Sequence, residues 1–145
     1  MDTDKVSQIT NGNMSYDKEE YCFVSKKGGY SFKTINIASG IKSFGILQML
    51  LRRGFLNERA LLILDEPEVN MHPKLQIKCA ELLVDIAKEL KTSILLTSHS
   101  PYFIEAIKVF SDSANFSNKT NFYFSTGYIE PVDNKINKFG DTFVP

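Results

Sequence analysis

The stretch Leu61-Leu62-Ile63-Leu64-Asp65-Glu66-Pro67 decides how this sequence is expected to fold. Four apolar residues run directly into two adjacent carboxylates, and a proline ends the run. A buried strand of a parallel sheet has this pattern, and the tip of such a strand is where acids are presented to a metal–phosphate site. The alternative is a core strand that ends at a solvated acidic turn, since short apolar runs are often simply strands.

The segments around this strand alternate between helical and strand patterns. Helical spacing of apolar residues covers 39–54 and 73–91, a second buried strand is predicted at 93–97, and a shorter helix at 101–109. The order strand–helix–strand–helix predicts an α/β fold with parallel strands and helices packed on the sheet. Because both apolar strands end in polar residues, the site is expected at the carboxyl edge of that sheet.

Two further pairs of short β-type runs lie outside this central part. The runs 21–24 and 30–34 flank Gly28-Gly29 and predict a small β-hairpin, in which the glycines supply positive φ at the turn. The runs 121–125 and 128–132 follow a loop rich in Ser and Asn.

Length and composition fit one ordinary globular domain. A chain of 145 residues with 43% hydrophobic and 23% charged residues can bury a core of its own. Residues 1–20 are polar, and we expect a disordered lead-in or an element whose partner lies elsewhere. The rest, 21–145, is interpreted as one α/β domain with its core at 30–110.

Charge and cysteine content exclude several classes of protein. Lys and Arg number 17, as do Asp and Glu, so the formal net charge is zero, and nothing in the charge favours nucleic acid or an anionic membrane as the main partner. Cys22 and Cys79 lack Cys-x-x-Cys spacing and indicate neither a zinc site nor a disulfide framework. The apolar runs are far shorter than the ~20 residues of a membrane span. We expect a cytoplasmic location and no membrane segment.

The first of three clusters that could bind a ligand is the pair of small residues Ser39-Gly40, where a helix is expected to begin. The free N–H groups and dipole of a helix that starts there favour an anion, and Gly40 lets the backbone approach it closely. The alternative is an ordinary Ser N-cap.

The other two clusters follow the two apolar strands. Asp65 is suited to hold Mg²⁺, mostly through water, and Glu66 to orient or deprotonate an attacking water. Glu68 is expected to be a solvated loop charge. His99 follows the second strand and could hydrogen-bond a γ-phosphate, and the alternative for it is a turn residue with local hydrogen bonds.

Together the clusters resemble the C-terminal half of an ABC-type ATPase head, in which a signature segment, a Walker B strand, a D-loop, a long helix and a switch histidine follow in this order. Ser39-Gly40-Ile41-Lys42 matches the signature, although Ile41 stands where a second glycine is usual. Residues 61–66 match Walker B, Asn70-Met71-His72-Pro73 the D-loop, and His99 the switch histidine. The resemblance covers residues 30–110 and implies a partial P-loop NTPase fold, in which 21–145 would be the C-terminal half of an ABC-type ATPase domain.

The Asp-Glu-Pro-Glu-x-x-x-His-Pro form is more similar to the non-transporter branch. That branch includes OLD, RecF-like and bacterial AAA-type ATPases that are linked to phage defence or DNA maintenance. The resemblance implies ATP and Mg²⁺ as cofactors, Glu66 and His99 as catalytic residues, and Asp65 as the metal residue. It also implies contacts with the nucleotide from four residues, Ser39, Gly40, Lys42 and Asn70.

The sequence contains no P-loop of the form Gly-x-x-x-x-Gly-Lys-Ser/Thr, which such an ATPase needs to wrap the phosphates. We expect the P-loop to lie upstream in a longer protein, with a separate chain as the alternative, and the isolated chain to be inactive. The resemblance implies a homodimer that sandwiches ATP, with nucleic acid as a further candidate partner of the full assembly.

Two other functions stay open. One is a non-hydrolysing, ATP-dependent binding or regulatory module. It is supported only by Ile41 and by His72, which stands where the D-loop of transporters usually has aspartate. The other is a metal-dependent nuclease built on Asp65, Glu66, Glu68 and His72. It is disfavoured because such sites usually draw their carboxylates from several elements, whereas these four residues come from one loop.

Overall fold

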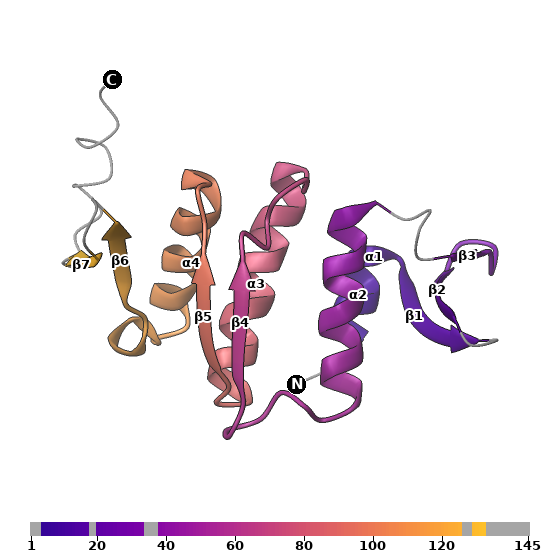
Figure 1. The fold of residues 1–145 in the computed structure, drawn as a ribbon, viewed down its shortest axis with the longest axis horizontal. Helices are drawn as coiled ribbons and strands as arrows, with labels where there is room; N and C mark the ends of the chain where they lie inside the picture. The colour runs from indigo at the N-terminus through magenta and orange to yellow at the C-terminus, as the bar shows by residue number, and fades with distance from the viewer. Residues whose placement is uncertain (1–3, 18–19, 34–37, 126–128, 133–145) are drawn as a thin grey trace. The chain divides into compact units, whose positions relative to one another are not determined.

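The computed structural model describes residues 4–17, 20–33, 38–125 and 129–132 (Figure 1). The chain divides into two compact units, Met1–Phe110 and Ser111–Pro145. The first unit contains all the predicted site residues. Its elements are α1 (Asp4–Thr10), β1 (Gly12–Asp17), β2 (Glu20–Ser25), β3 (Ser31–Lys33), α2 (Ser39–Arg52), β4 (Leu61–Asp65), α3 (Pro73–Glu89), β5 (Ser93–Thr97) and the larger part of α4 (Pro101–Ser113).

Strands β4 and β5 form a two-stranded parallel sheet, in register from Leu61 opposite Ser93 to Asp65 opposite Thr97. Figure 1 shows α3 and α4 behind these strands, so that both helices cover the same face of the sheet. The predicted α/β fold, with parallel strands and helices packed on the sheet, is confirmed. The two strands end at the same edge, which places the acids of the first beside the polar end of the second.

The prediction that 61–64 and 93–97 are buried strands is wrong for one face of the sheet. Leu61, Ile63 and Leu95 are 61%, 65% and 57% exposed, while the alternate positions that face the helices are half-buried. Parallel sheets are normally covered on both faces. Within the described residues, helices cover only one, and the apolar side chains of the other lie in contact with water.

Helix α3 shows how the sequence defines the sheet's helical cover. Pro73 occupies the first turn, where its missing N–H costs nothing. The His72 Nδ1 atom accepts a hydrogen bond of 3.3 Å from the Lys74 amide and caps the helix. Apolar residues at helical spacing then turn one face to the core, with Leu82 and Ile86 fully buried. The three helices predicted from the apolar spacing are all present.

The N-terminal part of this unit is a three-stranded antiparallel sheet in the order β1-β2-β3. Its β2–β3 pair is the predicted hairpin, and Gly28 and Gly29 have the expected positive φ of 84° and 66°. The structure also gives α1 and β1 within the polar lead-in of residues 1–20, with Val6 and Met14 buried. Over residues 4–17, that segment is therefore regular structure that packs on the rest of the unit.

The second unit contains the 3₁₀ turn Ser117–Lys119 and the antiparallel pair β6 (Phe122–Ser125) and β7 (Ile129–Val132). These strands correspond to the β-type runs 121–125 and 128–132, although residues 126–128 lie outside the described residues. In the part of the chain that the structure describes, no helix has the length and apolar character to cross a membrane.

Candidate functional site

Thr97 fixes both acids at the carboxyl edge of the parallel sheet. Its hydroxyl donates a hydrogen bond of 2.5 Å to the Asp65 Oδ1 atom. The Glu66 amide donates to the Thr97 carbonyl and hydroxyl oxygens, each at 3.2 Å. Sequence reasoning did not single out Thr97, although the strand register that pairs it with Asp65 could have identified it.

Glu66 and His99 form the central contact of the site. The His99 Nε2 atom lies 2.9 Å from the Glu66 Oε1 atom. Glu66 has a φ of +44°, a left-handed conformation that costs energy for a residue with a side chain and that clusters at functional sites. The contact spans two strand tips, so the alternative of a His99 with only local hydrogen bonds is wrong. The imidazole is 89% exposed, which leaves the pair accessible from outside.

The donor set at Asp65 suits Mg²⁺ better than a metal held only by protein. Asp65 is exposed at the strand tip, and one of its oxygens accepts from Thr97. Mg²⁺ commonly keeps several waters and takes one or two carboxylates together with phosphate oxygens. No group of three or more His, Cys, Asp or Glu side chains that could hold a metal occurs in the described ranges. A multi-carboxylate centre, as the nuclease hypothesis requires, is therefore not assembled there.

The prediction that Glu68 is a solvated loop charge is wrong. Glu68 is 3% exposed, and its Oε1 atom accepts a hydrogen bond from the Ser98 hydroxyl, the neighbour of His99. Burial, followed by the charge of Glu68, raises the pKa of the Cys79 thiol to about 12. The loop after β4 therefore points one carboxylate outward and another into the interior.

The predicted signature segment begins α2, and its details differ from the Ser N-cap alternative. The N-cap position is Ala38 and has no side-chain capping bond, while Ser39 is the first helical residue and is exposed. Gly40 is buried, and a Cβ atom there would lie 3.1 Å from the Met71 Cγ atom. The glycine thus permits close packing of α2 on the predicted D-loop, and this packing is independent of the predicted approach of a phosphate to Gly40.

The other two predicted nucleotide residues flank this contact. Lys42 is half-buried in the first turns of α2. Asn70 is exposed and has a φ of +61°, and its carbonyl oxygen would lie 3.8 Å from a Cβ atom at Gly40. The structure therefore brings the predicted signature segment against the predicted D-loop, and separately brings Asp65, Glu66 and His99 together at the strand tips.

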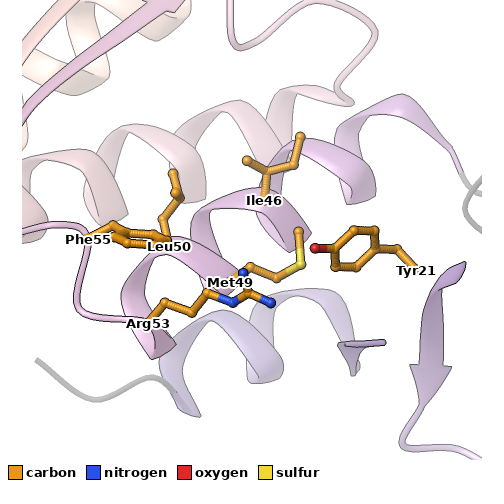
Figure 2. Close-up of a pocket in the computed structure, with 6 residues that line it drawn as sticks. All are labelled: Tyr21, Ile46, Met49, Leu50, Arg53 and Phe55. Atoms are coloured by element: carbon orange, nitrogen blue, oxygen red, sulfur yellow. The ribbon is translucent and has the colours of Figure 1, made fainter. Parts of the chain in front are cut away.

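A surface pocket lies away from these residues (Figure 2). It is formed on one side of α2, and Figure 2 shows the Tyr21 ring reaching from β2 toward the Met49 side chain. None of the predicted catalytic, metal or nucleotide residues lines it. The lining residues are Tyr21, Ile46, Met49, Leu50, Arg53 and Phe55.

A parallel sheet with helices on one face and an acidic pair at its carboxyl edge corresponds to part of a P-loop NTPase fold. The chain belongs to the AAA ATPase domain family, whose model matches residues 3–104. The match covers the acid loop, the signature segment and His99, and ends before the second unit.

The proteins similar to this chain include a sequence relative and a solved structure. The thiamine import ATP-binding protein ThiQ of Photobacterium profundum is 34% identical over 95 residues, which are 66% of this chain. Those residues are only 32% of that relative, so the chain spans about a third of its length. A solved structure from work on ATP-driven dimerization and DNA-stimulated activation of SMC ATPases matches with a TM-score of 0.60 at 11% identity, covering 97% of this chain and 89% of the other. At that identity the likeness concerns the fold.

Proposed function

We propose that this chain forms the signature, Walker B and switch-histidine half of an ATP-hydrolysing site. The observation that carries the proposal is the 2.9 Å contact between Glu66 and His99, beside an Asp65 that Thr97 holds in place. These three side chains come from two neighbouring strand tips, where parallel sheets bind phosphate ligands. Membership of an ATPase domain family supports the same chemistry.

In this proposal each residue has one task. Mg²⁺–ATP supplies the electrophilic γ-phosphate and the charge that activates it. Glu66 orients the attacking water and accepts its proton, as a carboxylate within hydrogen-bond reach can do. His99 holds the Glu66 oxygen through Nε2 and is exposed enough to meet a phosphate oxygen. Asp65 would hold Mg²⁺, mostly through water, and the Thr97 hydroxyl fixes the orientation of the Asp65 carboxylate.

A P-loop must come from elsewhere, because the sequence contains none. The uncovered apolar face of β4 and β5 supports a second structural part that packs on this sheet. We assign the P-loop to that part, in the same polypeptide or in another chain. Two such heads are proposed to sandwich ATP, with Asp65, Glu66 and His99 acting on one nucleotide and Ser39, Gly40, Lys42 and Asn70 on the facing one.

The non-hydrolysing alternative loses part of its support. It rested on the departures at Ile41 and His72, and His72 caps α3 through its Nδ1 atom. A histidine at this position therefore has a local structural reason that does not require the loss of hydrolysis. Ile41 remains the only departure without such a reason.

The decisive experiment replaces Glu66 by Gln in the protein that carries this chain together with its P-loop. We expect kcat for ATP hydrolysis to fall by roughly 10²- to 10⁴-fold, the usual value of a general base. Because ATP still binds, the variant should accumulate as an ATP-bound dimer in size-exclusion chromatography with light scattering. Glu58→Gln, which changes an exposed carboxylate in the loop before β4, is the matched control.

Unchanged turnover in Glu66→Gln would refute the catalytic assignment. A loss of turnover without an ATP-dependent dimer would keep the catalytic role and refute the sandwich. The isolated chain should bind ATP weakly at best and show no turnover above the rate of its own Glu66→Gln variant.

A further inference from the structure

The segment that carries His99 has no regular structure of its own. Residues 98–100 lie between β5, which ends at Thr97, and α4, which begins at Pro101. The His99 side chain is 89% exposed and is not held by packing. Its contact with Glu66 therefore depends on whatever fixes the residues on either side of it.

One anchor lies on the N-terminal side of His99. The Ser98 hydroxyl donates to the Oε1 atom of the buried Glu68, and the same hydroxyl accepts a hydrogen bond of 3.1 Å from the Ser100 amide. Glu68 belongs to the loop that starts with Glu66, so this bond joins the two loops whose side chains form the central pair.

A second anchor lies on the C-terminal side. The Ser100 hydroxyl donates to the Gln76 Oε1 atom at 2.8 Å and accepts from the Phe103 amide at 3.3 Å. Gln76 lies on α3, and its Nε2 atom donates to the Met71 carbonyl at 3.2 Å. The first anchor thus attaches the His99 segment to the loop between β4 and α3, and the second attaches it to the first turn of α3.

The first anchor is costly for the folded state. Glu68 is 3% exposed, and its Oε2 atom has no hydrogen-bond partner among the described residues. A buried carboxylate with an unpaired oxygen destabilises a fold, whereas an apolar residue of similar size would not. The Glu68 carboxylate lowers the stability of the fold while it holds the segment of His99. Function explains such a residue better than packing does.

We propose that Glu68 and Gln76 are positioning residues, which hold Ser98 and Ser100 so that the His99 imidazole meets the Glu66 carboxylate. Neither side chain touches the reacting atoms. The effect on ATP turnover rests on the proposed function, but the effect on the Glu66–His99 contact does not.

The contact can be tested in the 145-residue chain without nucleotide. We expect nuclear Overhauser effects between the His99 imidazole and the Glu66 side chain in the unchanged protein. Ser98→Ala and Gln76→Leu, each of which removes one anchor, should weaken them at least about threefold. Glu68→Gln keeps an acceptor for the Ser98 hydroxyl and should retain them, as should Glu105→Gln, an exposed change on α4.

Activity provides the second readout, again in the protein that carries the P-loop. Misplacement of a catalytic group by about 1 Å can cost roughly 10²-fold, so Ser98→Ala should lower kcat between about tenfold and a hundredfold with KM for ATP unchanged. Ser98→Thr, which restores a hydroxyl, should recover most of the loss. Unweakened Overhauser effects in a folded Ser98→Ala refute the proposal. If those effects weaken while Glu66→Gln leaves turnover unchanged, the positioning stands and the proposed function fails.

Discussion

The two faces of the β4–β5 sheet should differ in how strongly the same substitution destabilises the fold. Leu61 and Leu62 are adjacent and identical, but Leu61 is 61% exposed on the open face while Leu62 is half-buried against the helices. Leu61→Lys and Leu62→Lys therefore form a pair of variants with the same chemistry, nearly the same position and different surroundings.

The magnitudes follow from burial. Full burial of a leucine side chain is worth about 1.5–3 kcal/mol, and a lysine at Leu62 also forces a charge toward the helices, so Leu62→Lys should destabilise the chain by about 2–4 kcal/mol. Leu61→Lys removes little buried area and should change stability by no more than about 0.5 kcal/mol, as surface substitutions do. It should also reduce self-association, because it places a charge on an open apolar face of a chain whose formal net charge is zero.

Urea denaturation followed by far-ultraviolet circular dichroism measures the first effect. With a slope of about 1–2 kcal/mol per molar urea for a small domain, Leu62→Lys should lower the midpoint by at least about 1 M. Sedimentation velocity of the chain and of Leu61→Lys over a range of concentrations measures the second. Equal destabilisation by both variants would refute the one-sided sheet. A chain that stays monomeric at every concentration would refute the expected self-association through the open face.

Two further predictions concern single titratable groups. Because burial, followed by the charge of Glu68, raises the pKa of Cys79 to about 12, a thiol reagent at pH 8 should label the half-buried Cys22 first, and labelling of Cys79 should require unfolding. The hydrogen bond from Lys78 is the largest cause of the lowered pKa of Glu81, so Glu81 stabilises the fold above its unfolded pKa and loses that contribution as the pH falls below about 4.5. Glu81→Gln should cost at most about 1 kcal/mol at pH 7 and less at pH 3, in urea titrations at both pH values. Fast labelling of Cys79, or an equal cost at both pH values, would contradict these expectations.

The parts of the fold that follow local patterns could be predicted from the sequence. Apolar spacing predicted α3, and the polar ends of two short apolar runs predicted that Asp65 and His99 lie at one edge of the sheet, where the paired strands have them. The exposure of Ile63 could not be predicted, because an apolar run has the same letters whether one face or both are covered. Whether one face or both are covered depends on which other elements pack on the sheet.

Long-range contacts explain the other differences. A seven-residue helix such as α1 is too short to be stable alone. It is held by tertiary contacts, among them the Lys5 ammonium, which lies 3.1 Å from Glu81 on α3 and also pairs with Asp85. Glu68 looked like a solvated charge because carboxylates are almost never fully buried unless paired. Its partner Ser98 comes from another strand tip, so the sequence near Glu68 contains no sign of it.

The loop between β4 and α3 contacts both the segment that carries His99 and the start of α2. Glu68 holds the segment of His99, and Met71 packs on Gly40 at the start of α2. In the proposed sandwich, His99 acts on the nucleotide of its own head and Gly40 on that of the facing head. A change at one nucleotide that moves this loop would then alter the contacts with the other nucleotide. The reason is that Glu68 and Met71 lie only three residues apart in a segment anchored at both ends. Gly40→Ala tests this link, because a Cβ atom 3.1 Å from the Met71 Cγ atom requires the Met71 side chain to shift by a few tenths of an ångström.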